Sequence, residues 1–269
     1  MDYRGTPRPK KSLGQNFLRD PHYLQRIVDT AQVKPDDLVL EIGPGLGHLT
    51  KLLTQRAHKV LAIEVDERLI RHLHCEFGTA GNIEIVHADA LTYPYHALTG
   101  SWKVVANLPY YISTPIIQTL LKNHEKFRDL TLMLQKEVAE RIAAPPGGKE
   151  YGYLSVLVQY YSKPQMEFLV PRGAFTPRPE VDSAVITLAL RDQPAVLVRD
   201  ELYFIRLIKA AFSHRRKTLK NALKQLDVPK TKLDSALPRV GIDLNRRAET
   251  LSVEEFGKLA DLFLPDDSP

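Results

Sequence analysis

Strand-like runs alternate with helical patterns through most of this chain, and the alternation restricts the fold more than any other feature. Five runs of mainly aliphatic residues, separated by helical patterns, occupy residues 38–42, 60–65, 83–86, 103–106 and 130–134. Strands that alternate with helices in this way form a parallel sheet covered on both faces. Two later runs, at residues 166–170 and 184–190, bring the predicted sheet to seven strands. We therefore predict an α/β fold of the Rossmann-like kind with a mostly parallel sheet.

The pattern changes near residues 191–194, and no convincing strand follows Leu202. Apolar residues then lie along one side of a helix that the Ser213-His214 pair interrupts, at Ile205, Ile208, Phe212, Leu219, Leu223 and Leu226. We predict two domains: residues 1–192, with the sheet and a basic N-terminal arm, and residues 193–269, which are helical.

A glycine-rich turn follows the first strand of the predicted sheet. Gly43, Gly45 and Gly47 have the spacing G-x-G-x-G, and not the G-x-G-x-x-G of dehydrogenases that cradle a pyrophosphate. Glycines at this place let the backbone turn sharply and approach a ligand closely. Glu64 ends the second strand, about 20 residues further on, where a carboxylate commonly accepts hydrogen bonds from ribose hydroxyls.

Polar side chains also follow the next two strands. Asp89 comes after the third strand and could accept a hydrogen bond from an adenine amino group. Asn107, Leu108, Pro109 and Tyr110 follow the fourth strand, and this set suits a flat base that carries an exocyclic amine. Each feature alone has an ordinary structural explanation, such as a strand-end cap or a turn. Their order at consecutive strand ends is that of S-adenosylmethionine-dependent methyltransferases.

Six segments together form a specific set of motifs: residues 11–18, the glycine turn, Asn107 to Tyr110, and residues 175–183, 212–221 and 247–249. This set resembles the ribosomal RNA adenine dimethyltransferase family, in particular its bacterial members that act on 16S rRNA. The resemblance implies a class I S-adenosylmethionine-dependent methyltransferase sheet with a small C-terminal helical domain. It also implies that S-adenosylmethionine contacts Asn16, Leu18, Gly43, Gly45, Glu64, Asp89 and Asn107.

The resemblance implies the substrate as well. The target is two adjacent adenosines in the hairpin loop near the 3′ end of 16S rRNA, in the immature 30S subunit. Each adenosine is methylated twice at N6 during small-subunit biogenesis. A monomeric enzyme is implied too.

The Asn-Leu-Pro-Tyr motif suits this chemistry. The side-chain oxygen of Asn107 and the carbonyl of Leu108 can accept hydrogen bonds from adenine N6, which stabilises the positive charge that develops during methyl transfer. Pro109 restricts Leu108 to extended conformations and so fixes its carbonyl. Tyr110 offers a stacking face for a base that has left its stack. On the resemblance, Phe175 is the second ring of the stack, although its spacing alone favours a core residue.

Positive charge is concentrated in two places, while the formal net charge is only +5. Residues 206–224 contain seven Lys or Arg residues and no acid, and the first eleven residues form a basic arm. Such clusters favour a polyanionic partner, although a solvated helix face is the plainer alternative. We predict that four of these residues contact RNA phosphates: Arg215, Arg216, Lys217 and Lys220.

Other features of the sequence bear on the cellular location and on the competing functions. We read no secretory signal and no apolar run long enough to span a bilayer, and Cys75 is the only cysteine. We therefore expect a cytoplasmic protein with no metal, membrane partner or DNA partner. The alternatives left open are a 23S rRNA adenine methyltransferase, a DNA adenine methyltransferase, a non-enzymatic 30S assembly checkpoint or transcription factor, and a nicotinamide dehydrogenase.

Overall fold

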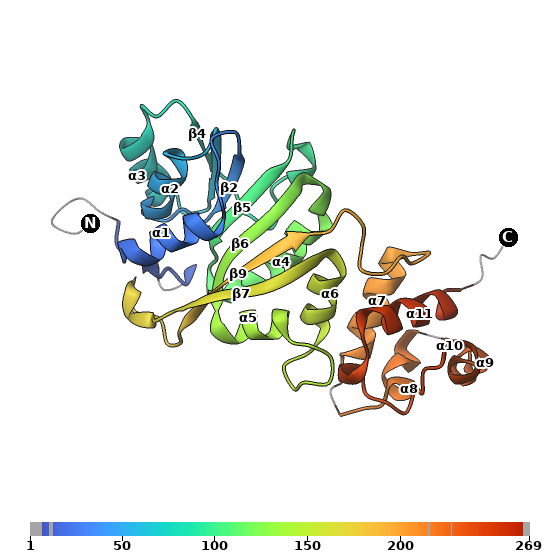
Figure 1. Cartoon of the computed structure of the whole chain (residues 1–269). Coiled ribbons are helices and arrows are strands. Elements are labelled where there is room, and N and C mark those ends of the chain that lie inside the picture. The colour runs from blue at the N-terminus through green and yellow to red at the C-terminus, as the bar shows by residue number, and fades with distance from the viewer. Residues whose placement is uncertain (1–6, 11–12, 215, 227, 266–269) are drawn as a thin grey trace. The chain divides into compact units, whose positions relative to one another are not determined.

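A seven-stranded sheet forms the centre of the first part of the chain (Figure 1). The computed structural model describes residues 7–10, 13–214, 216–226 and 228–265. The strand order is β4-β3-β2-β5-β6-β9-β7, which confirms the seven predicted strands. Their bounds are β2 Leu38–Ile42, β3 Lys59–Glu64, β4 Ile83–His87, β5 Trp102–Asn107, β6 Phe127–Gln135, β7 Ser162–Val170 and β9 Ser183–Leu190.

The strand order reverses at β2. The chain runs outward from β2 through β3 to β4, and then returns to the other side of β2 as β5, all in parallel pairs. β6 continues in parallel beside β5, whereas β9 pairs antiparallel with β6. A reversal of this kind opens a crevice beyond the carboxyl ends of the two strands beside it, and ligands bind in such crevices. The topology therefore places a binding site at the ends of β2 and β5.

One face of the sheet is covered by α1 (Pro21–Thr30) and α2 (His48–Thr54). The side chain of Asp20 caps α1 by accepting from the His22 amide at 2.9 Å, and Pro21 occupies the first turn. A continuous core joins the two helices to the strands, through Leu24, Ile27, Val28, Leu49, Leu53, Val39, Val60, Val105, Met133 and Val185. Fully burying each such side chain stabilises the fold by roughly 1.5–3 kcal/mol.

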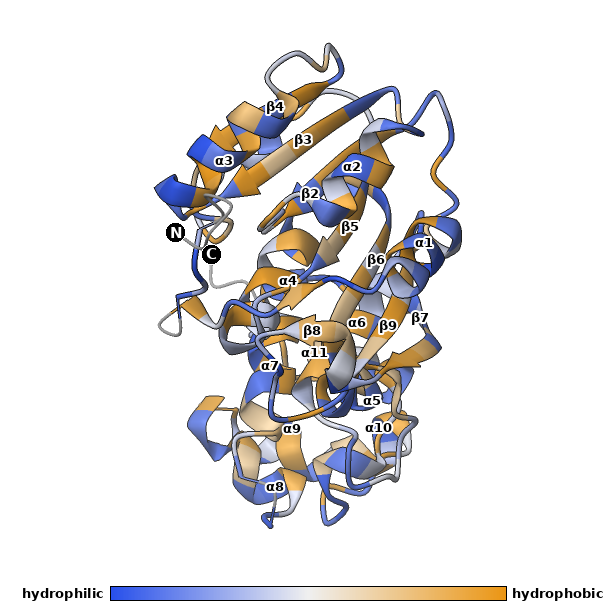
Figure 2. Cartoon of the chain, turned by 90° about the vertical axis from the view of Figure 1, so that its left-hand side faces the viewer, coloured by the Kyte–Doolittle hydropathy of each residue, from blue (hydrophilic) through white to orange (hydrophobic). Residues whose placement is uncertain are grey.

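Amphipathic helices connect successive strands of the sheet. α3 (Glu67–Phe77) carries hydrophilic residues between hydrophobic ones along its length (Figure 2) and buries Leu69, Ile70 and Leu73. α4 (Ser113–Lys122) follows the single turn η3 (Tyr110–Ile112), and α5 (Lys136–Ala143) follows β6. No helix among the described residues is long and apolar enough to cross a bilayer.

A buried charged network closes the end of the sheet away from the crevice. Lys103, on β5, is 7% exposed, and its Nζ donates to the Ala31 carbonyl at 2.8 Å. The same Nζ lies 3.3 Å from Asp129 and 3.8 Å from Asp37, which also pairs with Arg128. Burial raises the pKa of Asp37, but its hydrogen bonds and the nearby cations outweigh burial and leave the pKa below its usual range. These partners explain how the lysine is tolerated inside the sheet.

A two-residue ribbon pairs the N-terminal arm, of which the structure describes residues 7–10 and 13–18, with a distant loop. β1 (Phe17–Leu18) runs antiparallel to β8 (Phe175–Thr176), with Leu18 opposite Phe175. The sequence patterns did not predict this pairing, because two residues carry no periodicity. The ribbon fixes the arm at the edge of the crevice described below.

The C-terminal part is helical among its described residues. It contains α7 (Glu201–Ala211), α8 (Leu219–Ala222), η6 (Leu223–Leu226), α9 (Lys230–Asp234), α10 (Ala236–Val240) and α11 (Val253–Phe263). The earlier helix α6 (Tyr153–Tyr161), which precedes β7, packs in the same compact unit. The predicted interruption after Phe212 is confirmed, since α7 ends at Ala211 and α8 begins at Leu219. The Tyr160 and Phe204 rings stack with their centroids 4.5 Å apart, which joins α6 to α7.

By compactness the chain divides into two units. One comprises Met1–Ala139 and Pro164–Leu190, and the other Glu140–Lys163 and Arg191–Pro269. Residues 140–163 thus pack with the C-terminal helices, although they lie between β6 and β9 in the chain and include the first two residues of β7. The functional division at residues 192 and 193, between cofactor binding and RNA binding, stays a prediction.

Candidate active site

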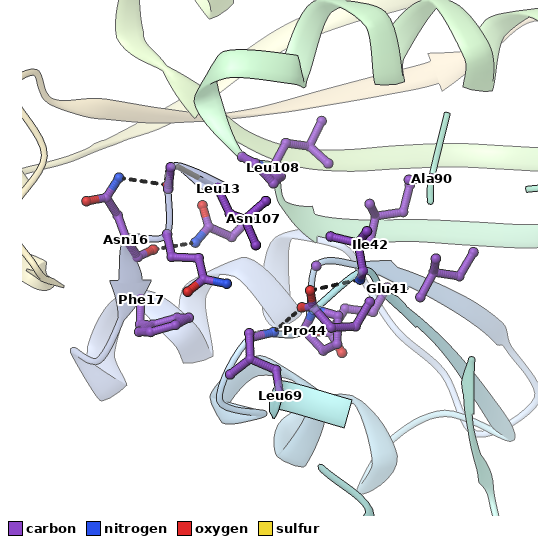
Figure 3. A pocket seen from close by; sticks show the side chains of 18 of the residues that line it. Leu13, Asn16, Phe17, Glu41, Ile42, Pro44, Leu69, Ala90, Asn107 and Leu108 are labelled. Carbon is purple, nitrogen blue, oxygen red and sulfur yellow. Dashed lines mark hydrogen bonds between the residues drawn. The ribbon is translucent and has the colours of Figure 1, made fainter. Parts of the chain in front are cut away.

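A pocket lies at the crevice between the ends of β2 and β5 (Figure 3). The N-terminal arm, the glycine turn and the ends of β3 and β4 complete its wall. Every predicted cofactor residue lines it: Asn16, Leu18, Gly43, Gly45, Glu64, Asp89 and Asn107. The Asn-Leu-Pro-Tyr motif lines it as well, whereas Phe175 is not among the lining residues.

The glycine turn requires left-handed backbone. Gly45 has φ +61°, and a Cβ there would lie 2.9 Å from the Phe17 ring of the arm. Both the backbone angle and the close packing therefore exclude larger residues at this position. The Gly45 amide donates to Glu64 Oε2 at 3.3 Å, so the turn also holds the acid at the end of β3.

Glu64 is buried, with a carboxylate held by backbone amides. Its Oε1 accepts from the Val65 and Asp66 amides, each at 2.9 Å. Burial raises the pKa of Glu64, and these amide hydrogen bonds oppose the rise. Each carboxylate oxygen can accept about two hydrogen bonds. Oε2, which accepts only the longer bond from Gly45 among the described residues, can therefore take a hydroxyl donor from a ligand.

Glu41 is a pocket residue to which sequence reasoning gave no role. It is the last residue but one of β2 and is 1% exposed, and its Oε2 has no hydrogen-bond partner among the described residues. Burial raises the pKa of Glu41 to about 8, and the nearby Glu64 adds to the rise. Its position in the strand-end sequence Glu41-Ile42-Gly43 was the available signal, but sequence gives no measure of burial at a strand end.

The raised pKa of Glu41 predicts a pH-dependent stability. Between pH 4.5 and about 8 the folded state keeps a proton on Glu41 that the unfolded chain releases. The free energy of unfolding of the native chain should therefore fall as pH rises through this window. Glu41→Gln should remove this fall and be the more stable form above pH 8. Urea unfolding at several pH values measures the difference, and parallel profiles for the two proteins would contradict the assignment.

Asn107 is the last residue of β5, and a hydrogen bond to the N-terminal arm orients its carboxamide. Its Nδ2 donates to the Asn16 carbonyl at 3.2 Å (Figure 3), and Asn16 Nδ2 in turn donates to the Gly14 carbonyl at 3.1 Å. A carbonyl can only accept, so the nitrogen of Asn107 must face the arm. The oxygen of the carboxamide then faces away from the arm and is left to accept.

The remaining motif residues are differently exposed. Leu108 is 1% exposed, and its amide donates to the Met133 carbonyl at 3.2 Å. The Tyr110 hydroxyl makes a short hydrogen bond with Ser183 at the start of β9, and burial raises the pKa of Tyr110. Asp89 is exposed at the pocket, where its Oδ1 caps the following turn by accepting from the Leu91 amide.

Phe175 lies in the hydrophobic core that α1 and α2 share with the sheet. The residue is 4% exposed and belongs to the cluster that includes Leu18 and Leu24. A stacking role stays a prediction, and it requires the ring to leave this cluster when a base enters.

The predicted RNA contacts lie in the C-terminal helical part. Arg216 and Lys217 are exposed, and Arg215 lies outside the described residues. Lys220 Nζ pairs with Asp234 at 2.9 Å, so part of its charge is already compensated. Their role toward RNA stays a prediction.

Sheet order and crevice together give the molecule the Rossmann-like architecture of class I S-adenosylmethionine-dependent methyltransferases. A more specific assignment comes from the sequence, since the family model described as ribosomal RNA adenine dimethylase matches residues 7–264. The chain belongs to this family, whose members are rRNA adenine methyltransferases.

Individual relatives agree with the assignment. The chain is 50% identical over 254 residues to the ribosomal RNA small subunit methyltransferase A of Clostridium perfringens, with 93% of this chain and 89% of the relative covered. It is 48% identical over 263 residues to the protein of the same name from Moorella thermoacetica, with 94% and 91% covered.

Two solved structures share the fold. The dimethyladenosine transferase from Plasmodium falciparum has a TM-score of 0.74 and 29% identity, over 90% of this chain and 95% of that one. The 23S rRNA methyltransferase ErmE has a TM-score of 0.71 and 28% identity, over 92% and 99%.

Proposed function

We propose that the chain transfers methyl groups from S-adenosylmethionine to N6 of two adjacent adenosines in the hairpin loop near the 3′ end of 16S rRNA. Each becomes N6,N6-dimethyladenosine. The observation that carries the proposal is the Asn107 carboxamide, whose oxygen is oriented as an acceptor in the crevice by its bond to Asn16. The small-subunit target is supported by relatives of that name at 48–50% identity.

The residues of the pocket fit S-adenosylmethionine. In this proposal Glu64 Oε2 accepts from a ribose hydroxyl and the exposed Asp89 carboxylate accepts from the adenine amine, which is supported by both acids lining the pocket. The unpartnered Oε2 of Glu41 fits a donor group of the methionine part. Leu46 and Leu69 form an apolar cluster with Phe17 in the same wall. S-adenosylmethionine carries no phosphate, so the pocket needs no phosphate-binding loop. When bound, the cofactor supplies an electrophilic methyl group on a sulfonium.

The motif at the end of β5 performs the transfer. Adenine N6 is a poor nucleophile because its lone pair is delocalised into the ring. As that lone pair localises on N6, the Asn107 oxygen and the Leu108 carbonyl accept hydrogen bonds from N–H groups that become more positive. Pro109 keeps Leu108 extended, and Tyr110 gives the base a stacking face. The remaining contribution is alignment of N6 with the methyl group at roughly 3–3.5 Å.

The basic residues before α8 contact the RNA backbone in this proposal. Arg216 and Lys217 reach phosphates of the paired stem, where recognition depends on shape and charge. Reversing both charges, as Arg216→Glu and Lys217→Glu, should weaken binding to small subunits and reduce the slope of log affinity against log salt by about 1–2. Filter binding between low and moderate salt measures both quantities. The control is Lys149→Glu on an exposed residue of the C-terminal unit, and an unchanged slope in the double variant would contradict the contact.

The chain acts as a monomer in the cytoplasm on immature 30S subunits, without a membrane, DNA or metal partner. One competing target has a specific observation in its favour, because the fold is shared with a 23S rRNA methyltransferase. A non-enzymatic assembly role is the second competitor, and it can coexist with catalysis.

Transfer of labelled methyl groups to purified ribosomal subunits tests the target. Small subunits lacking the modification should be labelled near the 3′ end of their rRNA, while large subunits stay unlabelled. Label in the large subunit would select the 23S alternative. Tight binding of small subunits with no label in either would select the assembly role.

A further inference from the structure

The N-terminal arm is held by an acid that the cofactor site does not use. Asp66 caps the start of α3, and its side chain is only 1% exposed. Its Oδ2 accepts from Gln15 Nε2 at 3.0 Å, and its Oδ1 lies 3.5 Å from Lys10 Nζ. The Arg68 guanidinium, followed by Gln15, holds the pKa of Asp66 well below its usual range, so it remains an acceptor at all working pH values.

Gln15 connects this anchor to the reacting end of the pocket. Its Oε1 accepts from the Lys10 amide at 2.7 Å, while its Nε2 is bound to Asp66. The next residue, Asn16, offers the carbonyl that receives the Asn107 carboxamide. The arm then continues into β1, where the Leu18 carbonyl contacts the His48 ring at 3.0 Å.

A carboxamide has a donor side and an acceptor side of nearly the same shape. If the Asn16 carbonyl moved away, the Asn107 side chain could turn over and present its NH₂ to the substrate amine. Two donors facing each other repel, and the developing positive charge on N6 would be destabilised. The arm therefore determines which side of Asn107 the base meets.

We propose that Gln15 and Asp66 are positioning residues for methyl transfer, which hold the Asn16 carbonyl where it turns the oxygen of Asn107 toward the target base. This inference rests on the proposed function of Asn107. The hydrogen bond from Gln15 to Asp66 then acts in the transfer step. The pocket acids have the separate role of holding the cofactor.

Gln15→Ala tests the proposal, because it releases the arm and leaves the Asp66 cap on α3 in place. The single-turnover rate at saturating cofactor should fall about tenfold, equivalent to about 1.4 kcal/mol. Saturating cofactor does not restore this rate, although the KM for S-adenosylmethionine can rise as well, because Asn16 and Leu18 of the same arm line the cofactor pocket. Gln15→Glu places a second carboxylate beside Asp66, and its single-turnover rate should fall by more than tenfold. The matched control is Gln25→Ala, since Gln25 Nε2 makes the same kind of bond to Asp29 at 2.9 Å on the exposed side of α1.

Hydrogen exchange of residues 13–18, with S-adenosylhomocysteine present, reports the arm without any catalysis. Gln15→Ala should accelerate exchange there, and Gln25→Ala should not. A slower rate together with a looser arm supports the proposal. An unchanged rate, a slower rate with an unchanged arm, or a change in KM alone each overturns it. If the native chain transfers no methyl group, the proposed function fails, whereas exchange still shows whether Gln15 holds the arm.

Discussion

Asn107→Ala lowers the turnover of methyl transfer by about 10²–10³-fold and leaves cofactor affinity within a few-fold of the native value. The magnitude is that of removing one preorganised hydrogen-bonding group from a reacting centre. The Asn107 side chain makes one described hydrogen bond, to the Asn16 carbonyl, so its loss leaves the backbone pairing of β5 and the glycine turn intact. Single-turnover kinetics and calorimetric titration with S-adenosylhomocysteine measure the two quantities separately.

A matched asparagine gives the control. Asn123 directly follows α4, and its Nδ2 donates to the Thr119 carbonyl at 2.9 Å; it is not among the residues that line the pocket. Asn123→Ala should keep near-native turnover. If both variants slow the reaction equally, the loss at Asn107 is one of folding, and its proposed acceptor role is wrong.

Glu64→Gln produces the reverse pattern, with cofactor affinity reduced about 100-fold and turnover at saturating cofactor nearly retained. Hydrogen bonds to a charged acceptor are worth about 1.5–3 kcal/mol each, and a loss of about 2.7 kcal/mol corresponds to this factor. The amide of glutamine would also set a donor against one of the backbone amides now bound to Glu64. Titration calorimetry with S-adenosylhomocysteine measures the dissociation constant.

Glu84→Gln is the control for this variant, since Glu84 lies on β4 with 53% of its side chain exposed and pairs with Lys59. Its cofactor affinity should be native. An unchanged dissociation constant for Glu64→Gln would remove Glu64 from the cofactor site. A loss of affinity alone in Glu64→Gln and a loss of turnover alone in Asn107→Ala would show that Glu64 binds the cofactor and Asn107 acts in the transfer.

The sheet and the positions of the pocket residues could be predicted from the sequence, because the strands have apolar patterns and the pocket residues directly follow or end them. Strand runs of five to nine residues have recognisable apolar patterns, and the carboxyl ends of neighbouring parallel strands must meet at one edge. Gly43, Glu64, Asp89 and Asn107 therefore had to lie together once the strands were assigned.

What the sequence could not provide depends on contacts between distant segments. The two-residue ribbon that pairs Leu18 with Phe175 has no period to detect. The bonds from the Gln15 side chain to Asp66 and from the Asn107 side chain to the Asn16 carbonyl join residues far apart in the chain. The raised pKa of Glu41 depends on burial by all its neighbours, and a strand-end acid in sequence looks the same when it is exposed.

Nucleoside analysis of rRNA from unmodified small subunits, after incubation with the native chain and S-adenosylmethionine, tests the central claim most directly. The account predicts that N6,N6-dimethyladenosine accumulates to two residues for each particle and that Asn107→Ala forms almost none. Methyl groups on any other atom, or equal product from native chain and variant, would contradict a reaction at adenine N6 carried by the acceptors at the end of β5.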